Sequence, residues 1–324
     1  MKWKKLGKIF DPTDYTLPNN CVEFAQSPQT LVFDNFIRIY FSTRERDTSG
    51  KFLSHIAFVD FDKQFKKILK VSNNTVIKLG NLGCFDEHGI FPLNILKTEN
   101  KLFGYIGGWS RRVSVSVDGS IGIALSNDEG LTFKRIGDGP ILTASFDEPF
   151  MVGDPFVFLC RDVYHMWYIY GVKWIKRSKN DIAERVYKIG HARSNDGIYW
   201  CKDGNNKQLI SDKLNVNECQ ALPTVVEFNG RFHMFFCYRN VFDFRNVKNK
   251  GYRIGYAYSK NLIDWKRDDK NVGIGVSTNG WDSDMLCYPH VFRLDDKIYM
   301  LYNGNEFGKF GFGLAILEDK NNEY

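Results

Sequence analysis

The sequence has no long apolar segment and no regular cysteine pattern. No run of residues approaches the roughly 18 apolar side chains that a membrane-spanning helix needs, so we expect no membrane span. The first eight residues carry charge with no apolar stretch behind them, unlike a secretory signal peptide. The seven cysteines are an odd number without a CxxC pair, which argues against a disulfide framework. These absences predict a cytoplasmic protein with reduced thiols.

The sequence also lacks a dense basic block and a metal-binding pattern. Its net charge is +6, and the Lys and Arg residues are spread along the chain, so no nucleic-acid partner is indicated. Three His or Cys residues at fixed spacing are absent, and we predict no metal and no cofactor. Aromatic residues, by contrast, make up 15% of the chain. Such a content favours β-sheets, and it also suits the stacking of sugar rings.

Five prolines recur along the chain and mark an internal repeat. They are Pro28, Pro92, Pro155, Pro223 and Pro289, which stand 63 to 68 residues apart. A repeat of this length indicates an array of similar supersecondary units. Each marker proline opens a short apolar strand, which a polar turn follows.

Three further strands follow in most repeats. Residues 232–236 form an aromatic-rich strand, residues 254–257 carry a Gly-x-Ala pattern, and a turn then leads to the closing aromatic Trp265. Turns such as Asn195-Asp196-Gly197 are hairpin signals. Four short strands in each of five repeats predict an all-β, five-bladed β-propeller.

The ends of the chain help to distinguish a propeller from the alternative architecture, which is a pair of β-sandwiches. The fifth repeat stops at its third strand, residues 311–317, while the segment that begins at Trp3 resembles the fourth strand that begins at Trp265. We therefore predict that the N-terminal strand closes the last blade, which leaves no exposed sheet edge. The prediction is a single propeller domain over residues 1–324.

Acidic residues precede the first strand of each repeat, where they would converge on one end of the central channel. Glu23, Glu87, Glu218 and Asp284 each stand five residues before a marker proline, and Asp154 stands directly before Pro155. Acids also suit solvated turns, so any one of them has a structural alternative. As a ring, they indicate a functional site.

The ends of the predicted second strands contribute basic and aromatic side chains to the same region. An Arg there could grip a phosphate or carboxylate, or form a salt bridge between blades. The two histidines near the first strands could be ligands or structural residues. The predicted substrate-binding residues are Glu23, Gln26, Arg44, His88, Trp109, Arg111, Arg239, Asp284 and His290.

On these features the chain resembles the five-bladed propeller glycosidases, namely the arabinanase and β-xylosidase, invertase and mannoside phosphorylase families. The resemblance covers nearly the whole chain through the repeat. It implies that Asp154, in the segment 152–156, orients the substrate. It also implies that Glu218, in the segment 217–223, is the general acid.

The chain departs from that pattern in the first repeat. Those families place an Asp directly before the first marker proline, where this sequence has Ser27. Ser27 cannot act as the carboxylate base of a two-carboxylate hydrolase. Glu87 or Glu23 could replace it as the base, with Glu87 as the catalytic candidate beside Glu218 and Asp154. Alternatively, phosphate is the acceptor and no base is needed, with basic residues to hold it: Arg44, Arg111 and Arg239.

Three functional hypotheses follow. The first is a glycoside hydrolase-like enzyme that makes or breaks a glycosidic bond, with Glu218 as proton donor. The second is a cytoplasmic glycosyltransferase or phosphorylase that handles phosphate-activated sugars for surface polysaccharides. The third is a non-catalytic sugar-binding propeller, because one fold hosts many functions. In each case the expected ligand is a carbohydrate or a sugar phosphate.

Overall fold

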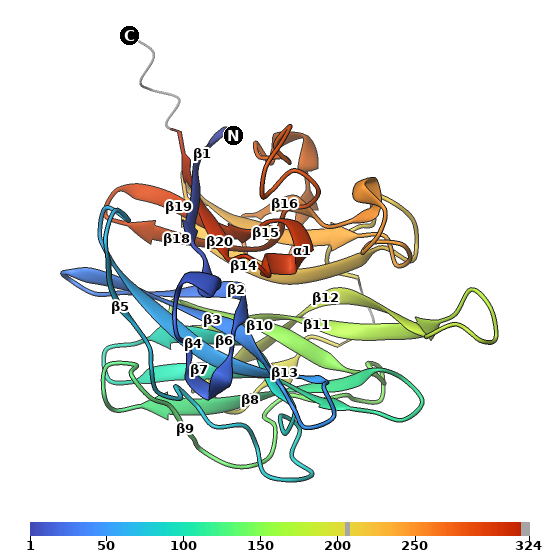
Figure 1. Ribbon diagram of the computed structural model, residues 1–324. Helices are drawn as coiled ribbons and strands as arrows, with labels where there is room; N and C mark the ends of the chain where they lie inside the picture. Colours follow the sequence, from blue (N-terminus) through green and yellow to red (C-terminus); the bar gives the residue numbers. More distant parts are fainter. Residues whose placement is uncertain (205–207, 319–324) are drawn as a thin grey trace.

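The protein was analysed as a computed structural model, which describes residues 1–204 and 208–318. The chain is mainly β, as the sequence predicted. Within the described ranges, the strands form three four-stranded sheets and one eight-stranded sheet (Figure 1). Within each group of four strands the neighbours are antiparallel, and most consecutive strands are joined by short polar turns.

The three four-stranded sheets follow one another in the second half of the fold. One sheet contains β10 (Val152–Cys160), β11 (Val163–Ile175), β12 (Glu184–Ser194) and β13 (Cys201–Lys202). The next contains β14 (Cys219–Phe228), β15 (Arg231–Arg239), β16 (Arg253–Ser259) and β17 (Lys266–Arg267). The third contains β18 (Cys287–Leu294), β19 (Lys297–Asn303), β20 (Phe312–Leu317) and β1 (Trp3–Phe10).

The eight-stranded sheet consists of two antiparallel groups. The first group is β2 (Glu23–Val32), β3 (Phe36–Arg46), β4 (Phe52–Asp62) and β5 (Ile68–Val71). The second group is β6 (Gly89–Lys97), β7 (Leu102–Arg111), β8 (Val117–Ser126) and β9 (Lys134–Arg135). A parallel bridge between Ser54 and Gly89 joins the two groups.

In residues 1–204 and 208–318, helical structure is confined to short segments. The 3-10 turns there are η1 (Pro12–Asp14), η2 (Pro18–Asn20), η3 (Lys248–Lys250) and η4 (Asp269–Asn271), and the α turn is α1 (Asn305–Gly308). Among the residues that the structure describes, no helix has the length and apolar character needed to cross a bilayer.

The apolar core is divided into clusters between successive four-stranded groups. In each interface, residues from two neighbouring groups belong to the same cluster. Examples are Ile56 with Ile90, Tyr105 with Met166, Trp167 with Phe236, Phe235 with Met300, and Phe292 with Phe41. The last pair links the final group back to the first. The groups therefore pack on one another in a ring.

The N-terminal strand lies where the sequence predicted it. β1 pairs antiparallel with β20, with Trp3 opposite Leu317 and Phe10 opposite Phe312, and the two strands run side by side in Figure 1. Trp3 is buried against Phe235 of the neighbouring sheet. The two ends of the described chain thus form one sheet.

Candidate functional site

The first strand of each group is irregular at its marker proline. The register shifts there, and the preceding residue turns its side chain out of the regular alternation. Four of these preceding residues have φ near +50°, namely Ser27, Asp154, Leu222 and Tyr288. The fifth is Phe91, which is joined to Pro92 by a cis peptide bond. A left-handed φ is unusual for such side chains and is typical of functional positions.

A cavity of about 450 Å³ lies where these strands begin. Phe91, Asp154 and Tyr288, three of the bulged residues, line it. Other lining residues come from the hairpins between second and third strands, such as Trp109, Arg185 and Phe244. The cavity is therefore at one end of the ring, where all the groups converge.

Nine of the 23 described residues that line the cavity are aromatic. Trp109 lines it beside Phe52 and Phe91, and its indole N–H donates to Ser54 Oγ at 3.0 Å. That hydrogen bond orients the ring plane. Aromatic faces in a concave site of this size are suited to the C–H face of a sugar ring or to a nucleobase.

Three arginines line the cavity without an acidic partner. In the described part of the chain, all hydrogen bonds of the Arg44, Arg185 and Arg239 guanidinium groups go to neutral atoms. A fourth arginine, Arg245, is paired with Glu184 at 3.0 Å. Arg239 is buried, whereas Arg44 and Arg185 are partly exposed. A buried positive charge without a counter-charge is costly, so Arg239 in particular favours an anionic ligand in the cavity.

Arg239 is the most enclosed of the three. It is 2% exposed, and its guanidinium lies over the ring of Phe244 at 3.5 Å. Its Nε donates to the Tyr187 hydroxyl at 3.2 Å, and that hydroxyl lies 2.6 Å from the hydroxyl of Tyr252. This network fixes the guanidinium plane in the cavity wall.

Arg44 and Arg185 are less fully satisfied. Arg44 Nη2 donates to Gln26 Oε1 at 2.6 Å, and burial lowers the pKa of Arg44 to about 10. Arg185 Nη1 lies 3.5 Å from Ser116 Oγ, while its buried Nε has no partner. Free guanidinium N–H groups at a cavity can bind phosphate or carboxylate oxygens in a bidentate manner.

Asp154 is the one carboxylate among the described residues that line the cavity. It is 7% exposed, and its Oδ2 accepts one hydrogen bond, from the Leu222 N–H at 3.2 Å. Burial raises the pKa of Asp154 to about 7, although that hydrogen bond and the charge of Arg185 act to lower it. A carboxyl with this pKa can exchange a proton at neutral pH.

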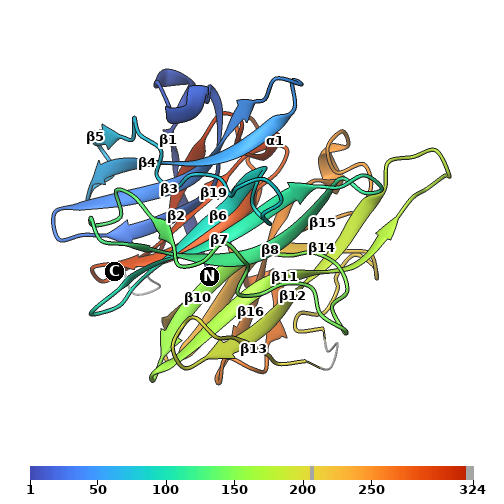
Figure 2. The same cartoon turned by 90° about the horizontal axis from the view of Figure 1, so that it is seen from below.

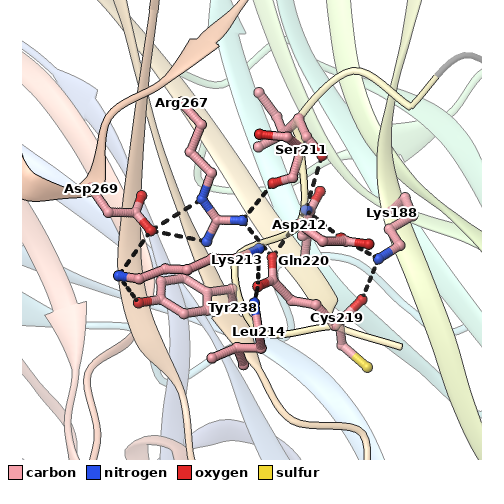
Figure 3. Close-up of polar contacts among 12 residues, drawn as sticks. Lys188, Ser211, Asp212, Lys213, Leu214, Cys219, Gln220, Tyr238, Arg267 and Asp269 are labelled. Carbon is pink, nitrogen blue, oxygen red and sulfur yellow. Dashed lines mark hydrogen bonds and ion pairs between the residues drawn. The ribbon is translucent and has the colours of Figure 1, made fainter. Parts of the chain in front are cut away.

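Glu218 lies outside the cavity lining and is completely buried. Its Oε1 accepts from Arg267 Nη1 at 2.6 Å and from Gln220 Nε2 at 3.1 Å, and its Oε2 accepts from the backbone N–H groups of Lys213 and Leu214. Figure 3 shows these partners converging from the segment before β14, from β14 itself and from β17. With four donors around it, this carboxylate has no free oxygen for a ligand.

Glu87, His88 and Glu23 also lie outside the cavity lining. Glu87 Oε2 accepts from the Gly83 N–H at 2.8 Å, and its Oε1 lies 3.3 Å from His88 Nδ1. The His88 ring stacks on Trp109 with centroids 6.1 Å apart, so it backs a wall residue. Glu23 Oε2 lies 3.7 Å from Lys309 Nζ.

Three other predicted residues have structural partners away from the cavity. Arg111 Nη1 pairs with Asp47 at 2.7 Å. Asp284 pairs with Lys248 at 2.9 Å, which lowers the pKa of Asp284. The His290 ring accepts from the Thr30 N–H at 3.1 Å, and burial lowers its pKa to about 3.

Of the residues predicted for the site, the structure thus places Gln26, Arg44, Trp109, Asp154 and Arg239 in one cavity lining. The sequence reasoning missed residues between the second and third strands, at the start of the third strand, and directly before a marker proline. Among the missed lining residues are Arg185, Tyr187, Arg245, Tyr252 and Tyr288. A search that covered both arms of each hairpin, and the residue before each marker proline, would have found most of them.

Solved structures of glycoside hydrolases share this architecture. One glycoside hydrolase aligns with a TM-score of 0.71 at 15% identity, over 98% of this chain and 93% of that chain. A family-43 enzyme of Xanthomonas citri complexed with xylose has a TM-score of 0.63 at 13% identity, over 98% and 91%. A family-32 β-fructofuranosidase of Bombyx mori has a TM-score of 0.59 at 14% identity, over 90% and 61%.

The chain therefore has the fold of the glycoside hydrolase families 43 and 32, which confirms at the level of the fold the resemblance predicted from its sequence. No protein-family model matches the chain. It belongs to the same family as two uncharacterized proteins of Mycobacterium tuberculosis, from two strains. Each is 32% identical over 320 residues, which span 98% of this chain and 100% of the relative.

Proposed function

We propose that the chain is a single five-bladed β-propeller and a carbohydrate-active enzyme that makes or breaks a glycosidic bond on a phosphate-activated sugar. Support for five blades comes from the strand groups: the eight-stranded sheet divides at its parallel bridge, and each group packs on the next around the ring. The glycosidase-like fold supports a carbohydrate as the ligand.

One observation carries the choice of ligand. Arg44, Arg185 and Arg239 face an aromatic cavity without an acidic partner, and Asp154 is the single carboxylate in the described lining. A two-carboxylate hydrolase needs a second acid at the reacting bond. Transfer or phosphorolysis does not need it, because phosphate itself leaves from or attacks the anomeric carbon. The guanidinium groups would stabilise the charge on that phosphate.

Asp154 is the residue that we assign to proton transfer. With a pKa of about 7 it is partly protonated at neutral pH. It can take the proton of an attacking sugar hydroxyl, or return a proton to that oxygen in the reverse direction. The role of general acid predicted for Glu218 remains a prediction, and its four donors argue for a structural role instead.

A cytoplasmic location is part of the proposal. All seven cysteines are unpaired, and Cys219, Cys237 and Cys287 are buried around the cavity core. Sugar nucleotides and sugar phosphates are cytoplasmic metabolites, so the proposed ligand and the free thiols suit the same compartment.

Calorimetric titration tests the proposed ligand. We expect nucleotide sugars or sugar 1-phosphates to bind about a hundredfold more tightly than the same free sugars, since each charge-assisted hydrogen bond contributes about 1.5–3 kcal/mol. Arg239→Gln should remove most of that preference while binding of free sugar persists. Arg231→Gln is the matched control, because Arg231 is exposed at the other end of β15.

Turnover then separates an enzyme from a binding protein. Incubation of wild-type protein with the tightest phosphate ligand and a panel of sugar acceptors should release phosphate or nucleotide. Equal affinity for neutral and phosphorylated sugars would refute the anion site. Tight binding without any turnover would leave the sugar-binding propeller as the function.

A further inference from the structure

Three neighbouring hairpins form a rim on one side of the cavity. The rim consists of residues 111–117, 172–185 and 240–250, and each part contributes to the cavity lining. The hairpin between β11 and β12 projects beyond the rest of the molecule in both views, at the right of Figure 1 (Figures 1 and 2). The rim therefore stands out from the body at the end where the cavity lies.

Polar contacts join the three parts of the rim. Arg245 pairs with Glu184 at 3.0 Å, Arg177 pairs with Asp243, and Arg185 Nη1 lies 3.5 Å from Ser116 Oγ. Arg177 also lies over the ring of Phe242 at 4.5 Å. The rim is thus a connected surface and not a set of independent loops.

Aliphatic side chains at the tips of the rim are exposed to solvent. Val113 is fully exposed, Ile182 is 80% exposed, and Val172 and Val247 are each 40% exposed. An exposed Val or Ile at a hairpin tip has no role in the packing of the fold. Apolar side chains grouped beside a cavity are typical of a surface that contacts an apolar phase or a partner.

The rim also carries an excess of positive charge. It has ten Lys and Arg residues and three Asp and Glu residues. Three of the cations pair with acids that lie just outside the rim, namely Asp47, Asp118 and Asp284, so the rim together with these acids has a net charge of +4. Basic side chains flank the exposed aliphatic ones directly, with Arg112 beside Val113 and Lys179 close to Ile182.

We propose that this rim docks the protein on an anionic membrane surface, with Val113 and Ile182 inserted among the lipids and the basic side chains at the headgroups. Exposed aliphatic side chains next to cations suit the surface of an anionic bilayer, where apolar burial and electrostatic attraction act together. Nucleic acids and acidic polysaccharides would satisfy the cations but leave the aliphatic tips in water. Docking in this way brings the mouth of the cavity to the membrane surface.

Vesicle co-sedimentation of the full chain tests the proposal. We expect binding to phosphatidylcholine vesicles that contain about 30–40% phosphatidylglycerol, because this anionic lipid makes the surface strongly negative. We expect little binding to vesicles of pure phosphatidylcholine. Lys176→Glu/Lys179→Glu should weaken binding to the anionic vesicles more than about tenfold. Val113→Ser/Ile182→Ser should weaken it by about tenfold, and this loss should persist in high salt.

Tyr199→Ser is the matched control. Tyr199 is 81% exposed in the turn after β12, at the opposite end of that strand from Ile182, and its loss should leave vesicle binding unchanged. Equal binding of wild type to neutral and anionic vesicles would overturn the proposal. So would an undiminished affinity of Val113→Ser/Ile182→Ser, or an equal effect of Tyr199→Ser. Thermal melts and free-ligand binding at the cavity show that each variant remains folded.

Discussion

Asp154 and Glu218 are two buried carboxylates in neighbouring sheets with contrasting surroundings. Asp154 accepts one hydrogen bond and lines a cavity, whereas Glu218 accepts four and pairs with Arg267. Burial with a single hydrogen bond raises the pKa of Asp154 to about 7 and leaves its proton exchangeable. Glu218 has a full set of donors, and its hydrogen bonds link the segment before β14 to β17. The comparison shows that burial alone does not identify a catalytic acid.

The largest expected effect is on turnover. Asp154→Asn keeps the shape of the side chain but removes proton transfer, so turnover of the phosphate ligand should fall about 10²–10⁴-fold. Ligand binding should persist, which calorimetry can check. Asp162→Asn, in the exposed turn of the same β-hairpin, is the control. Full activity in Asp154→Asn would end the assignment of Asp154 to the chemistry.

Glu218→Gln should act on stability. It removes the carboxylate charge that pairs with Arg267 Nη1, although Asp269 still pairs with the same guanidinium at 3.0 Å, so the loss of this charged hydrogen bond should cost about 1.5–3 kcal/mol. Urea unfolding measures this loss, and Glu227→Gln, at an exposed position of the same strand, should change stability by less than about 0.5 kcal/mol. Unchanged stability with abolished turnover would reverse the comparison and restore Glu218 as the catalytic acid.

The pH dependence of stability should separate the two carboxylates further. The folded-state pKa of Asp154 lies above its unfolded value, so its contribution is most favourable at low pH and is lost as pH rises through about 7. Relative to Asp154→Asn, wild type should lose up to roughly 4 kcal/mol between pH 4 and pH 8. Parallel stability curves for the two proteins would show that the carboxyl is not desolvated.

The smallest effect should come from Arg185→Gln. The charge of Arg185 lowers the pKa of Asp154, so its removal should raise that pKa by less than about one unit. The limb of the pH–rate profile that reports the titration of Asp154 should therefore shift to higher pH. A shift to lower pH would mean that Arg185 does not act on Asp154 through its charge.

The repeat made the fold predictable. The five prolines and the short strands between them specify the strand groups, and the incomplete last repeat specifies the pairing of β1 with β20. These are local patterns that turn chemistry and apolar alternation impose. They also placed Arg44, Trp109 and Arg239 at second-strand ends, and these residues do line the cavity.

The ring of acids was less predictable, for a physical reason. The bulge at the marker proline brings the preceding side chain to the cavity in three of the five groups, as at Asp154, while the residues five positions before each marker proline lie at or before the first residue of the strand. There, Glu23 lies near Lys309 and Glu218 pairs with Arg267. Sequence spacing does not reveal such long-range partners, nor does it show which cations lack one.

The pairing of β1 with β20 has a consequence for biosynthesis. β1 cannot join its sheet until β20 has been synthesised, more than 300 residues later. Throughout that time it is an unpaired strand that could associate with other nascent chains. Lys4, Lys5 and Lys8 lie within it and oppose such association by their charge. The same lysines therefore protect the nascent chain before they become part of the closed ring.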